Sequence, residues 1–283
     1  EAVRLDPDYA VAWARLAQIY ATNFWSNDNR AAEIANKART AAAAALRLDP
    51  NLPEARVALA TIHRGIDYDF DAAQGELNQV ERLRPNDAEI PAERAHLEFA
   101  RGNWGEGLVA LAALAAERDP QNAGSLAWMG YFLAFTGRFA EADRLFDRAW
   151  VGQGQPAPLR WKALAMVAWT GNVAAALALL ETCPQRLRNE RFHHTLAELT
   201  ALRGDAAATI AVNDQLRTAA RRDQPTFGRR NVEVVATYRM GWHHARLGNL
   251  ARTEELYSGA LALTEKLAGE FPQEPLSPLS VAL

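Results

Sequence analysis

Glycine recurs along this sequence at a nearly fixed interval, and this recurrence limits the folds open to the chain more than any other feature. Five glycines lie between apolar, helix-like runs, at Gly102, Gly137, Gly171, Gly204 and Gly248. Their spacings are 35, 34, 33 and 44 residues. A period in the thirties is typical of stacked supersecondary units, each of which contacts only its neighbours, and not of one compact core.

Proline marks the end of each unit. It recurs in settings such as LDP, RPND and DPQN, at Pro7, Pro50, Pro85, Pro120 and Pro156. A glycine supplies the left-handed backbone that ends a helix, whereas a proline cannot continue one. Each unit is therefore predicted to consist of a helix, a glycine turn, a second helix and a proline break.

Composition supports an all-α chain. The sequence has 283 residues, 49% of them hydrophobic, and good helix formers dominate it. Strand-favouring runs of Val, Ile and Thr are absent. No apolar run approaches the roughly 20 residues of a membrane span, so no such span is predicted.

Charge and cysteine content exclude further classes. The formal net charge is -3, and basic residues are interspersed with acidic ones along the predicted helices. This pattern is not typical of a nucleic-acid surface, so we expect no direct nucleic-acid partner. The single cysteine, Cys183, excludes an internal disulfide framework. It falls where a second helix usually holds a small residue, and we expect it to act as a small buried hydrophobe.

The repeat resembles the tetratricopeptide repeat (TPR), a helix–turn–helix of roughly 34 residues whose first helix is marked by Trp, Leu, a small residue and Tyr. In AVAWARLAQIY these places are held by Trp13, Leu16, Ala17 and Tyr20. The stretch GSLAWMGYFLAFTGRFAEADRLFDRAW matches both helices, through Leu126, Met129, Gly130, Leu133, Ala142, Phe146 and Ala149. The resemblance implies an all-α TPR solenoid, a right-handed superhelix of about seven repeats.

The TPR register divides the sequence into three parts. Residues 1–9 are expected to be the remnant of a preceding repeat, residues 10–268 the array, and residues 269–283 a proline-rich C-terminal tail. The repeats are expected to start near Ala10, Pro53, Ala88, Ala123, Ala157, Glu190 and Val234. Because the sequence begins inside a repeat and lacks an initiator Met, we take it as a piece of a longer protein.

The opening half is similar to one bacterial group in particular. Its stretches YAVAWARLAQIY, AAEIANKARTAAAAALRLDPNLPEARVALA and DYDFDAAQGELNQVERLRPNDAEI resemble a TPR region of multidomain signalling proteins. In that group the array follows a winged-helix DNA-binding domain or a class III nucleotide cyclase domain. The resemblance implies that effector activity lies upstream and that this region senses or recruits. We expect it to be cytoplasmic.

Patterns that suggest metal or catalytic sites have simpler explanations. Two Glu-x-x-His pairs, Glu93/His96 and Glu190/His193, could each point at an ion, but 97 residues separate them. The stretch GNWGEG lacks the preceding strand and the Lys-Ser/Thr of a phosphate loop, and it coincides with a predicted turn. No HExxH, GxSxG or Walker signature occurs. We therefore predict no catalytic residue, no metal site, no cofactor and no enzymatic activity in these residues.

The inner, concave surface of a TPR array is built mostly from the first helix of each repeat, so the resemblance implies a partner-binding groove there. Carrying over the positions that face this surface gives a set rich in aromatic and charged residues: Glu89, Glu93, His96, Phe99, Trp128, Tyr131, Phe135, Trp161, Lys162, Trp169, Arg191, His194, Glu198, Tyr238, Arg239, Trp242 and Arg246. Aromatic and Arg side chains are frequent anchors of binding hot spots. Acidic members, with Glu54, lie toward the N-terminal half and basic ones toward the C-terminal half.

Two function classes remain open. The first is a non-catalytic module that binds a protein or peptide through the aromatic groove. The second is a structural, regulatory or dimerisation segment that packs on the effector domain of its own chain. The Lys/Asn/Arg clamp of chaperone-binding TPR domains has no counterpart here, and neither has the asparagine ladder of some peptide-gripping arrays. We therefore predict neither a chaperone-tail receptor nor a sugar-transferase array.

The tail also bears on association. Pro272, Pro275 and Pro278 favour an extended path, while Leu276, Leu279, Val281 and Leu283 alternate with small polar residues. We expect the tail to cover the apolar face of the final helix or to enter the groove of a neighbouring molecule. A homo-oligomer could thus form through the groove or through the tail.

Overall fold

The computed structural model describes residues 2–26, 32–151, 155–222 and 227–270. Within these ranges all regular structure is helical and no strand occurs. The chain divides into two compact units, Glu1–Leu145 and Phe146–Leu283, and each is described by itself. The predictions for the tail from residue 271 onward lie outside the described residues.

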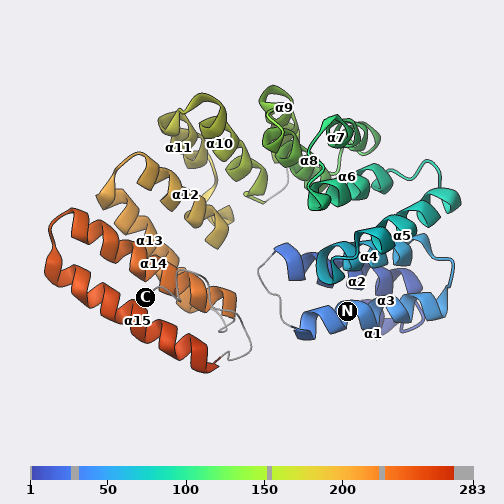
Figure 1. Cartoon of the computed structure of the whole chain (residues 1–283), viewed down its shortest axis with the longest axis horizontal. Helices are drawn as coiled ribbons and strands as arrows, with labels where there is room; N and C mark the ends of the chain where they lie inside the picture. The colour runs from blue at the N-terminus through green and yellow to red at the C-terminus, as the bar shows by residue number, and fades with distance from the viewer. Residues whose placement is uncertain (1, 27–31, 152–154, 223–226, 271–283) are drawn as a thin grey trace. The chain divides into compact units, whose positions relative to one another are not determined.

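The first unit is a succession of helices that pack against their neighbours in sequence (Figure 1). Its helices are α1 (Ala2–Leu5), α2 (Ala10–Ser26), α3 (Ala32–Leu48), α4 (Pro53–Ile62), the π-helical turn η1 (His63–Asp67), α5 (Phe70–Leu83), α6 (Glu89–Arg101), α7 (Glu106–Arg118), α8 (Ala123–Phe135) and the first part of α9 (Phe139–Trp150). The pairs α2/α3, α4/α5 and α6/α7 pack together, as expected for helix–turn–helix repeats, and α2 also packs extensively on α4.

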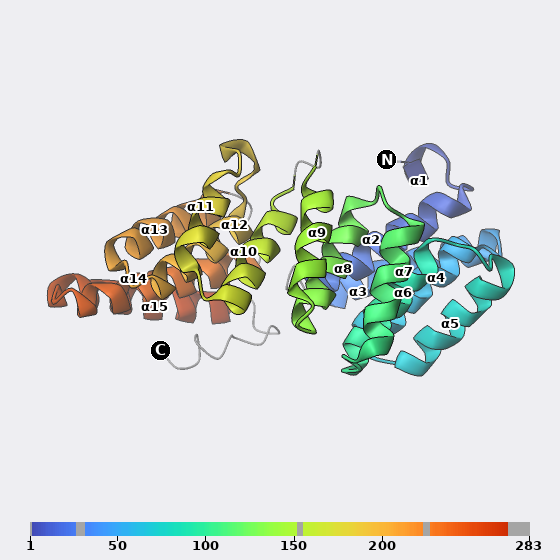
Figure 2. The ribbon, with the colours of Figure 1, turned by 90° about the horizontal axis from the view of Figure 1, so that it is seen from above.

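The second unit continues the same arrangement. After the rest of α9 come α10 (Ala157–Thr170), α11 (Val173–Glu181), the 3-10 turn η2 (Gln185–Leu187), α12 (Glu190–Leu202), α13 (Ala206–Arg222), α14 (Phe227–Arg246) and α15 (Leu250–Glu270). In both views α14 and α15 lie side by side (Figures 1 and 2). Helix α14 already begins at Phe227, before the expected repeat start near Val234.

The five recurrent glycines lie in turns between helices, as predicted, and all five have φ angles between 69° and 81°. At Gly137 the turn closes in the Schellman manner, because Arg138 N–H donates to Leu133 O at 2.8 Å. The residue after the glycine can then start the next helix. Asn172 does so when its side chain accepts a hydrogen bond from Ala175 N–H at 2.9 Å. Left-handed backbone disfavours any residue with a Cβ, which explains the glycines.

The helix pair α4/α5 has a tyrosine where five later pairs have a glycine. Tyr68 has φ 56° and is the sole non-glycine with positive φ among the described residues. It follows η1, and Asp69 N–H closes the turn on His63 O at 2.9 Å. The Asp69 side chain then caps α5 by accepting from Ala72 N–H at 2.9 Å. A complete turn thus forms around a residue that is strained in this conformation.

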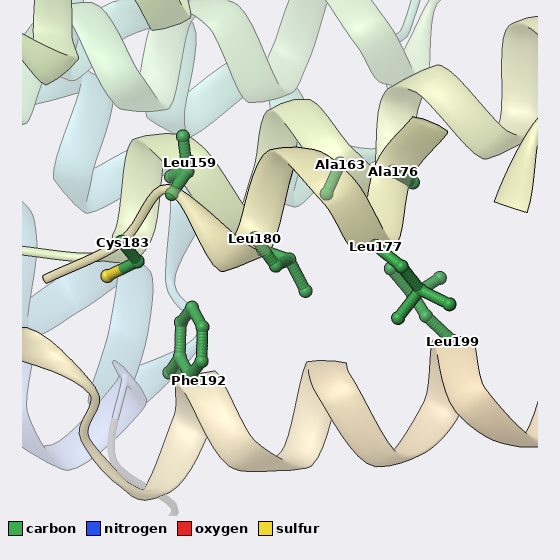
Figure 3. Close-up of a cluster of buried hydrophobic side chains, with 8 residues drawn as sticks. All are labelled: Leu159, Ala163, Ala176, Leu177, Leu180, Cys183, Phe192 and Leu199. Atoms are coloured by element: carbon green, nitrogen blue, oxygen red, sulfur yellow. The ribbon is translucent and has the colours of Figure 1, made fainter. Parts of the chain in front are cut away.

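Small and large apolar residues fill the space between helices. In the second unit one buried cluster joins α10, α11 and α12 through Leu159, Ala163, Ala176, Leu177, Leu180, Phe192 and Leu199 (Figure 3). Cys183 belongs to this cluster with 1% of its surface exposed, which confirms its prediction as a small buried hydrophobe. It follows the end of α11 instead of lying within a second helix, contrary to its expected place. Burial raises the pKa of its thiol, so the thiol stays protonated.

Alanine supplies the small partners in the first unit. Ala17, Ala38, Ala42 and Ala58 are each fully buried, and they pack with Ile62 where α2, α3 and α4 meet. Side chains of this size let helix backbones approach closely, as the TPR pattern requires. Within the described residues, none of the helices combines the length and the hydropathy of a membrane span.

Candidate functional site

The first helices of consecutive pairs in the first unit line a cavity of about 710 Å³, which we call the polar pocket. Its walls come from α2, α4, η1, α6 and α8 and from the residues that precede α6 and α8. Four predicted groove residues lie here: Glu89, Glu93, His96 and Trp128. The structure therefore brings these four together on the helices that the TPR register selected.

Glu89 and Glu93 of the polar pocket each have an arginine partner that was not predicted. The Nη1 atom of Arg15 lies 3.1 Å from Glu89 Oε1, and Gln18 Nε2 donates to the same oxygen at 2.9 Å. The Nη2 atom of Arg64 lies 3.7 Å from Glu93 Oε2. The same repeat positions, read in the first two repeats, would have selected Arg15, Gln18 and Arg64, so the signal was present in the sequence.

Burial shapes the charges of the inner pair. Only 11% of the Arg64 side chain and 13% of the Glu93 side chain are exposed. Burial raises the pKa of Glu93 against the opposing effect of Arg64, and it lowers the pKa of Arg64. The lining of the polar pocket holds four carboxylates, Asp87, Glu89, Glu93 and Asp119, and two arginines, Arg15 and Arg64, so the acidic character expected of the N-terminal half stays a prediction. Glu54 does not line the polar pocket, and it pairs with Arg84 at 2.8 Å.

His96 contributes an aromatic ring to this wall. Its ring meets those of Trp128 and Phe132 edge-on, with centroids 5.3 Å and 5.1 Å apart. Burial lowers the pKa of His96 well below its usual range, and the nearby Arg64 adds to this effect. The imidazole is therefore neutral at pH 7 and serves as a packing group.

Aromatic rings from α6, α8 and the turn after α6 form a continuous cluster. This aromatic cluster consists of Phe99, Trp104, Trp128, Tyr131, Phe132 and Phe135. Phe99 stacks on Phe132 at 4.6 Å, and Phe135 meets Trp104 edge-on at 4.7 Å. Phe132 is 1% exposed, whereas Trp104 and Phe135 are each 50% exposed. The cluster thus extends from the core to solvent.

Two members of the aromatic cluster, the buried Phe132 and the half-exposed Trp104, were not among the predicted groove residues. Trp104 lies in the GNWGEG turn, outside the repeat positions that face a groove, and its Nε1 donates to Phe99 O at 3.0 Å. That hydrogen bond fixes the indole against the predicted groove residues. The turn itself is confirmed, because Gly102 ends α6 in the left-handed conformation.

The second unit has a cavity of about 640 Å³ between α10, α12, α13 and α14, which we call the apolar pocket. Four predicted groove residues line it: Glu198, Tyr238, Arg239 and Trp242. Its other lining residues were not predicted: Leu164, Ala197, Ala201, Leu202, Thr209, Asn213 and His243. Most of them lie one turn from a predicted position or on the second helix α13, where the repeat pattern assigns no groove residue.

Charged residues around the apolar pocket are coupled to one another. The Nδ1 atom of His194 lies 3.2 Å from Glu198 Oε1, and this hydrogen bond, with Arg239 and Arg160, holds the pKa of Glu198 below its usual range. Burial and the nearby Arg191 lower the pKa of Arg160 to about 10, so it remains charged at pH 7.

Aromatic residues meet this charged region at α14. The guanidinium of Arg246 lies over the ring of Trp242, 4.9 Å from its centroid, which is a cation–π contact. Trp242 itself is 45% exposed. The predicted residues of α14 thus form one connected surface.

Three predicted groove residues of α10, Trp161, Lys162 and Trp169, line neither pocket. Lys162 Nζ lies 2.6 Å from Asp147 Oδ1, and only 14% of its side chain is exposed. Its charge is therefore engaged with α9. Trp169 is 55% exposed near the end of α10. Four of the predicted groove residues thus line the polar pocket, four line the apolar pocket, and these three line neither.

Metal ligation has no geometric support in the described part of the chain. No three His, Cys, Asp or Glu side chains there converge as a metal site would require. The Nδ1 atom of His193 lies 3.0 Å from Asn189 O, and its ring packs edge-on against Phe192 at 5.7 Å. This histidine has a packing role in α12.

Comparison with solved structures finds TPR proteins. A tetratricopeptide repeat protein from Parabacteroides merdae is 16% identical with a TM-score of 0.54, over 91% of this chain and 93% of that one. PilW, a widely conserved type IV pilus biogenesis factor, is 19% identical with a TM-score of 0.55, over 75% of this chain and 95% of PilW. Yeast Tom70 is 19% identical with a TM-score of 0.56, over 99% of this chain but 51% of Tom70.

Comparisons of the sequence with models of known protein families and with curated proteins gave no match. At identities below 20%, similarity to the solved structures speaks for the fold alone. That fold agrees with the helices and glycine turns described above: the chain is an all-α protein with the fold of a TPR solenoid.

Proposed function

We propose that the chain is a non-catalytic module that binds a protein or peptide through the surface formed by the first helices of its repeats. The aromatic cluster is the observation that carries this proposal. Its outer rings, Trp104 and Phe135, are half exposed, while its base at Phe132 is buried. Rings held in this way lose little freedom on binding, and aromatic residues are frequent hot spots of interfaces.

The polar pocket supports a peptide as the partner. Trp128 belongs both to this pocket and to the aromatic cluster, so one ligand could contact the two together. Arg15, Gln18 and Glu89 offer donors and acceptors for the polar groups of a main chain. An apolar side chain on the rings, with its backbone over these groups, would satisfy both surfaces.

We further propose that the module is the sensing or recruiting part of a larger bacterial signalling protein in the cytoplasm. The resemblance of the opening half to TPR regions behind winged-helix or class III cyclase domains supports this role. Effector activity would then belong to a segment outside these residues. A partner that binds the aromatic cluster would be the signal that reaches that segment.

Selection of peptides from a displayed library on the purified chain tests the proposal. We expect selected peptides to lose about 2 kcal/mol of binding free energy, roughly 30-fold in Kd, in Trp104→Ala and in Phe135→Ala. Tyr9→Ala is the matched control, because Tyr9 is also 50% exposed but lies outside the aromatic cluster and both pockets. Fluorescence anisotropy of a labelled peptide gives Kd, and circular dichroism verifies folding.

The alternative of a dimerisation or regulatory segment gives a different result. In that case no peptide depends on the aromatic cluster. Light scattering would instead show self-association that Trp104→Ala and Phe135→Ala abolish. That pair of results would overturn the proposal.

A further inference from the structure

Two buried polar side chains line the apolar pocket and leave one atom each without a hydrogen-bond partner. Asn213 is 0% exposed and His243 is 4% exposed. The unpartnered atoms are Oδ1 of Asn213 and Nδ1 of His243. Native proteins rarely leave buried polar atoms in this state, and a pocket lined by two of them is suited to a ligand that supplies the missing partners.

We propose that the apolar pocket binds a single aromatic ring that carries an O–H or N–H donor, the side chain of a tyrosine or tryptophan in the partner peptide. This assignment rests on the proposed function, since the ring belongs to the bound partner. The following observations fix in turn the shape, the polarity and the flanking charge of such a ligand.

The walls of the pocket favour a ring. Leu164 and Leu202 provide aliphatic surface, and Tyr238 and Trp242 provide aromatic surface. Two alanines, Ala197 and Ala201, leave space between them. The volume of about 640 Å³ lies within the range of roughly 300–1,000 Å³ that is usual for ligand pockets, and it leaves room for the chain that carries the ring.

The orientation of Asn213 specifies a donor on the ring. Its Nδ2 atom already donates to Thr209 O at 2.8 Å, so the remaining Oδ1 atom can only accept. A purely apolar ring would leave that acceptor unpaired in an apolar pocket, whereas the O–H of a phenol or the N–H of an indole would satisfy it. Sites with a buried polar group select ligands in this way.

The neutral imidazole of His243 indicates that the buried end of the ligand is neutral as well. Burial lowers the pKa of His243, and Arg246 and Arg239 add to the effect. The imidazole is therefore uncharged at pH 7, and its Nδ1 atom needs no ionic partner. A neutral phenol meets both Asn213 and His243, since it can donate to one and accept from the other, whereas an indole only donates and meets one of them.

Charge around the pocket specifies the residues that flank the ring. Arg239 lines the pocket, and Arg246 lies over the ring of Trp242. Arg160 and Arg191 add positive charge near Glu198, which is the one acidic residue among the lining residues of this pocket. A tyrosine or tryptophan between acidic residues therefore fits this surface by charge complementarity.

Small ring probes test the pocket without a peptide. Ligand-observed NMR on the full chain gives Kd for p-cresol and for toluene, which differ by one hydroxyl group. We expect the preference for p-cresol over toluene to fall about tenfold in Asn213→Leu, because leucine keeps the volume but removes the acceptor. Asn36→Leu is the control, because Asn36 is exposed on α3, and it should leave the preference unchanged.

A second variant covers the case in which Asn213→Leu fails to fold. Ala201→Trp places a ring in the pocket from a partly exposed position, and it should abolish binding of both probes. Failure of both probes to bind the native chain would overturn the proposal. A preference that Asn213→Leu leaves unchanged would overturn it as well.

A second binding experiment, with peptides, identifies the source of the ring. A pentapeptide with a central tyrosine between aspartates should bind at least about fivefold more tightly than its phenylalanine twin, and this difference should vanish in Asn213→Leu. If p-cresol binds but neither peptide does, the pocket accepts a free small molecule and the assignment to a partner side chain is wrong. Trp104→Ala should leave p-cresol binding unchanged, so failure of the proposed function is seen separately.

Discussion

At the scale of single residues, Tyr68 offers a direct measure of what the turn glycines contribute. It has φ 56° in a turn where five later helix pairs place glycine, and 53% of its surface is exposed. Left-handed backbone destabilises a residue with a Cβ by about 1–2 kcal/mol. Replacement by glycine removes this strain, but glycine also loses more chain entropy on folding, which offsets part of the gain. We expect Tyr68→Gly to raise the free energy of unfolding by about 1 kcal/mol. Urea unfolding followed by circular dichroism measures it.

The reciprocal change provides the control. Gly137 has φ 81° and nothing within 4 Å of an added Cβ, so Gly137→Ala introduces backbone strain without a clash. It should lower the free energy of unfolding by about 1–2 kcal/mol. Equal effects of the same sign from the two substitutions would contradict the strain assigned to Tyr68.

Individual site residues could be predicted only where the repeat pattern assigns a position. Glu93 and His96 were selected because first-helix positions face the inner surface, and both line the polar pocket. Trp104 lies in a turn, and Asn213 lies on a second helix, where that pattern is silent. A polar residue within a helix carries no sequence signal for burial, so the unpartnered atom of Asn213 could be found only from the packing around it.

At the scale of secondary-structure elements, the approach of α14 to α15 depends on one glycine. A Cβ added at Gly241 would lie 2.7 Å from Cε1 of Tyr257, whose ring stacks on that of Tyr238 at 5.2 Å. We expect Gly241→Ala to lower the free energy of unfolding by about 1–3 kcal/mol, because the ring must shift in a packed interface. Thermal and urea unfolding both report this loss.

Gly259 serves as the control within the same helix pair. It lies inside α15 with nothing within 4 Å of an added Cβ. Gly259→Ala should raise the free energy of unfolding by about 0.5–1 kcal/mol, through helix propensity alone. If Gly241→Ala also raised the free energy of unfolding, the ring of Tyr257 would not restrict the space beside position 241.

Elements were predictable from sequence where a local signal sets their ends. The glycine turns were, because a left-handed residue at a helix end has few alternatives to glycine. The turn at Tyr68 was not, because nothing local distinguishes this tyrosine from one in a helix. Cys183 was expected within a second helix, but α11 ends at Glu181 and a turn carries Cys183 into the core.

At the scale of the whole molecule, loss of one buried side chain should destabilise its own repeat and then the adjacent repeats, because stacked repeats contact only their neighbours. Phe146 is 1% exposed. We expect Phe146→Ala to lower the free energy of unfolding by about 3–5 kcal/mol. Hydrogen exchange should show the loss of protection first in α9.

Phe135→Ala is the matched control for this change. Phe135 is the same residue type but is 50% exposed, so it should lose about 1 kcal/mol or less. A loss below roughly 1 kcal/mol at Phe146 would contradict its buried position in the array.

The pH dependence of unfolding should reflect two histidines. Burial lowers the pKa of His96 beside Arg64, and that of His243 near Arg246 and Arg239. Each stays neutral in the folded chain but takes up a proton on unfolding below about pH 6.5. Their stabilising contribution is therefore present above that pH and is lost as the pH falls toward their folded pKa values. The expected slope approaches about 1.4 kcal/mol per pH unit for each histidine.

Urea unfolding between pH 7.5 and 5.5 measures this slope. We expect His96→Phe to remove the contribution of one histidine to the slope. Burial raises the pKa of Glu93, so that carboxyl acts in the opposite sense. Its stabilising contribution is present at acid pH and is lost as the pH rises through its folded value. An unchanged slope in His96→Phe would show that His96 does not remain neutral in the folded chain.

Because each glycine turn is closed by residues of its own repeat, such a chain can gain or lose repeats during evolution. Gly137 and Arg138 close their turn on Ala134 and Leu133, so the turn within a repeat depends only on residues of that repeat. Duplication or loss of a whole segment of roughly 34 residues by recombination would leave every other turn intact. The longest spacing, 44 residues between Gly204 and Gly248, fits this view, because the 17 residues of α13 and the 20 of α14 absorb the growth between two unaltered turns.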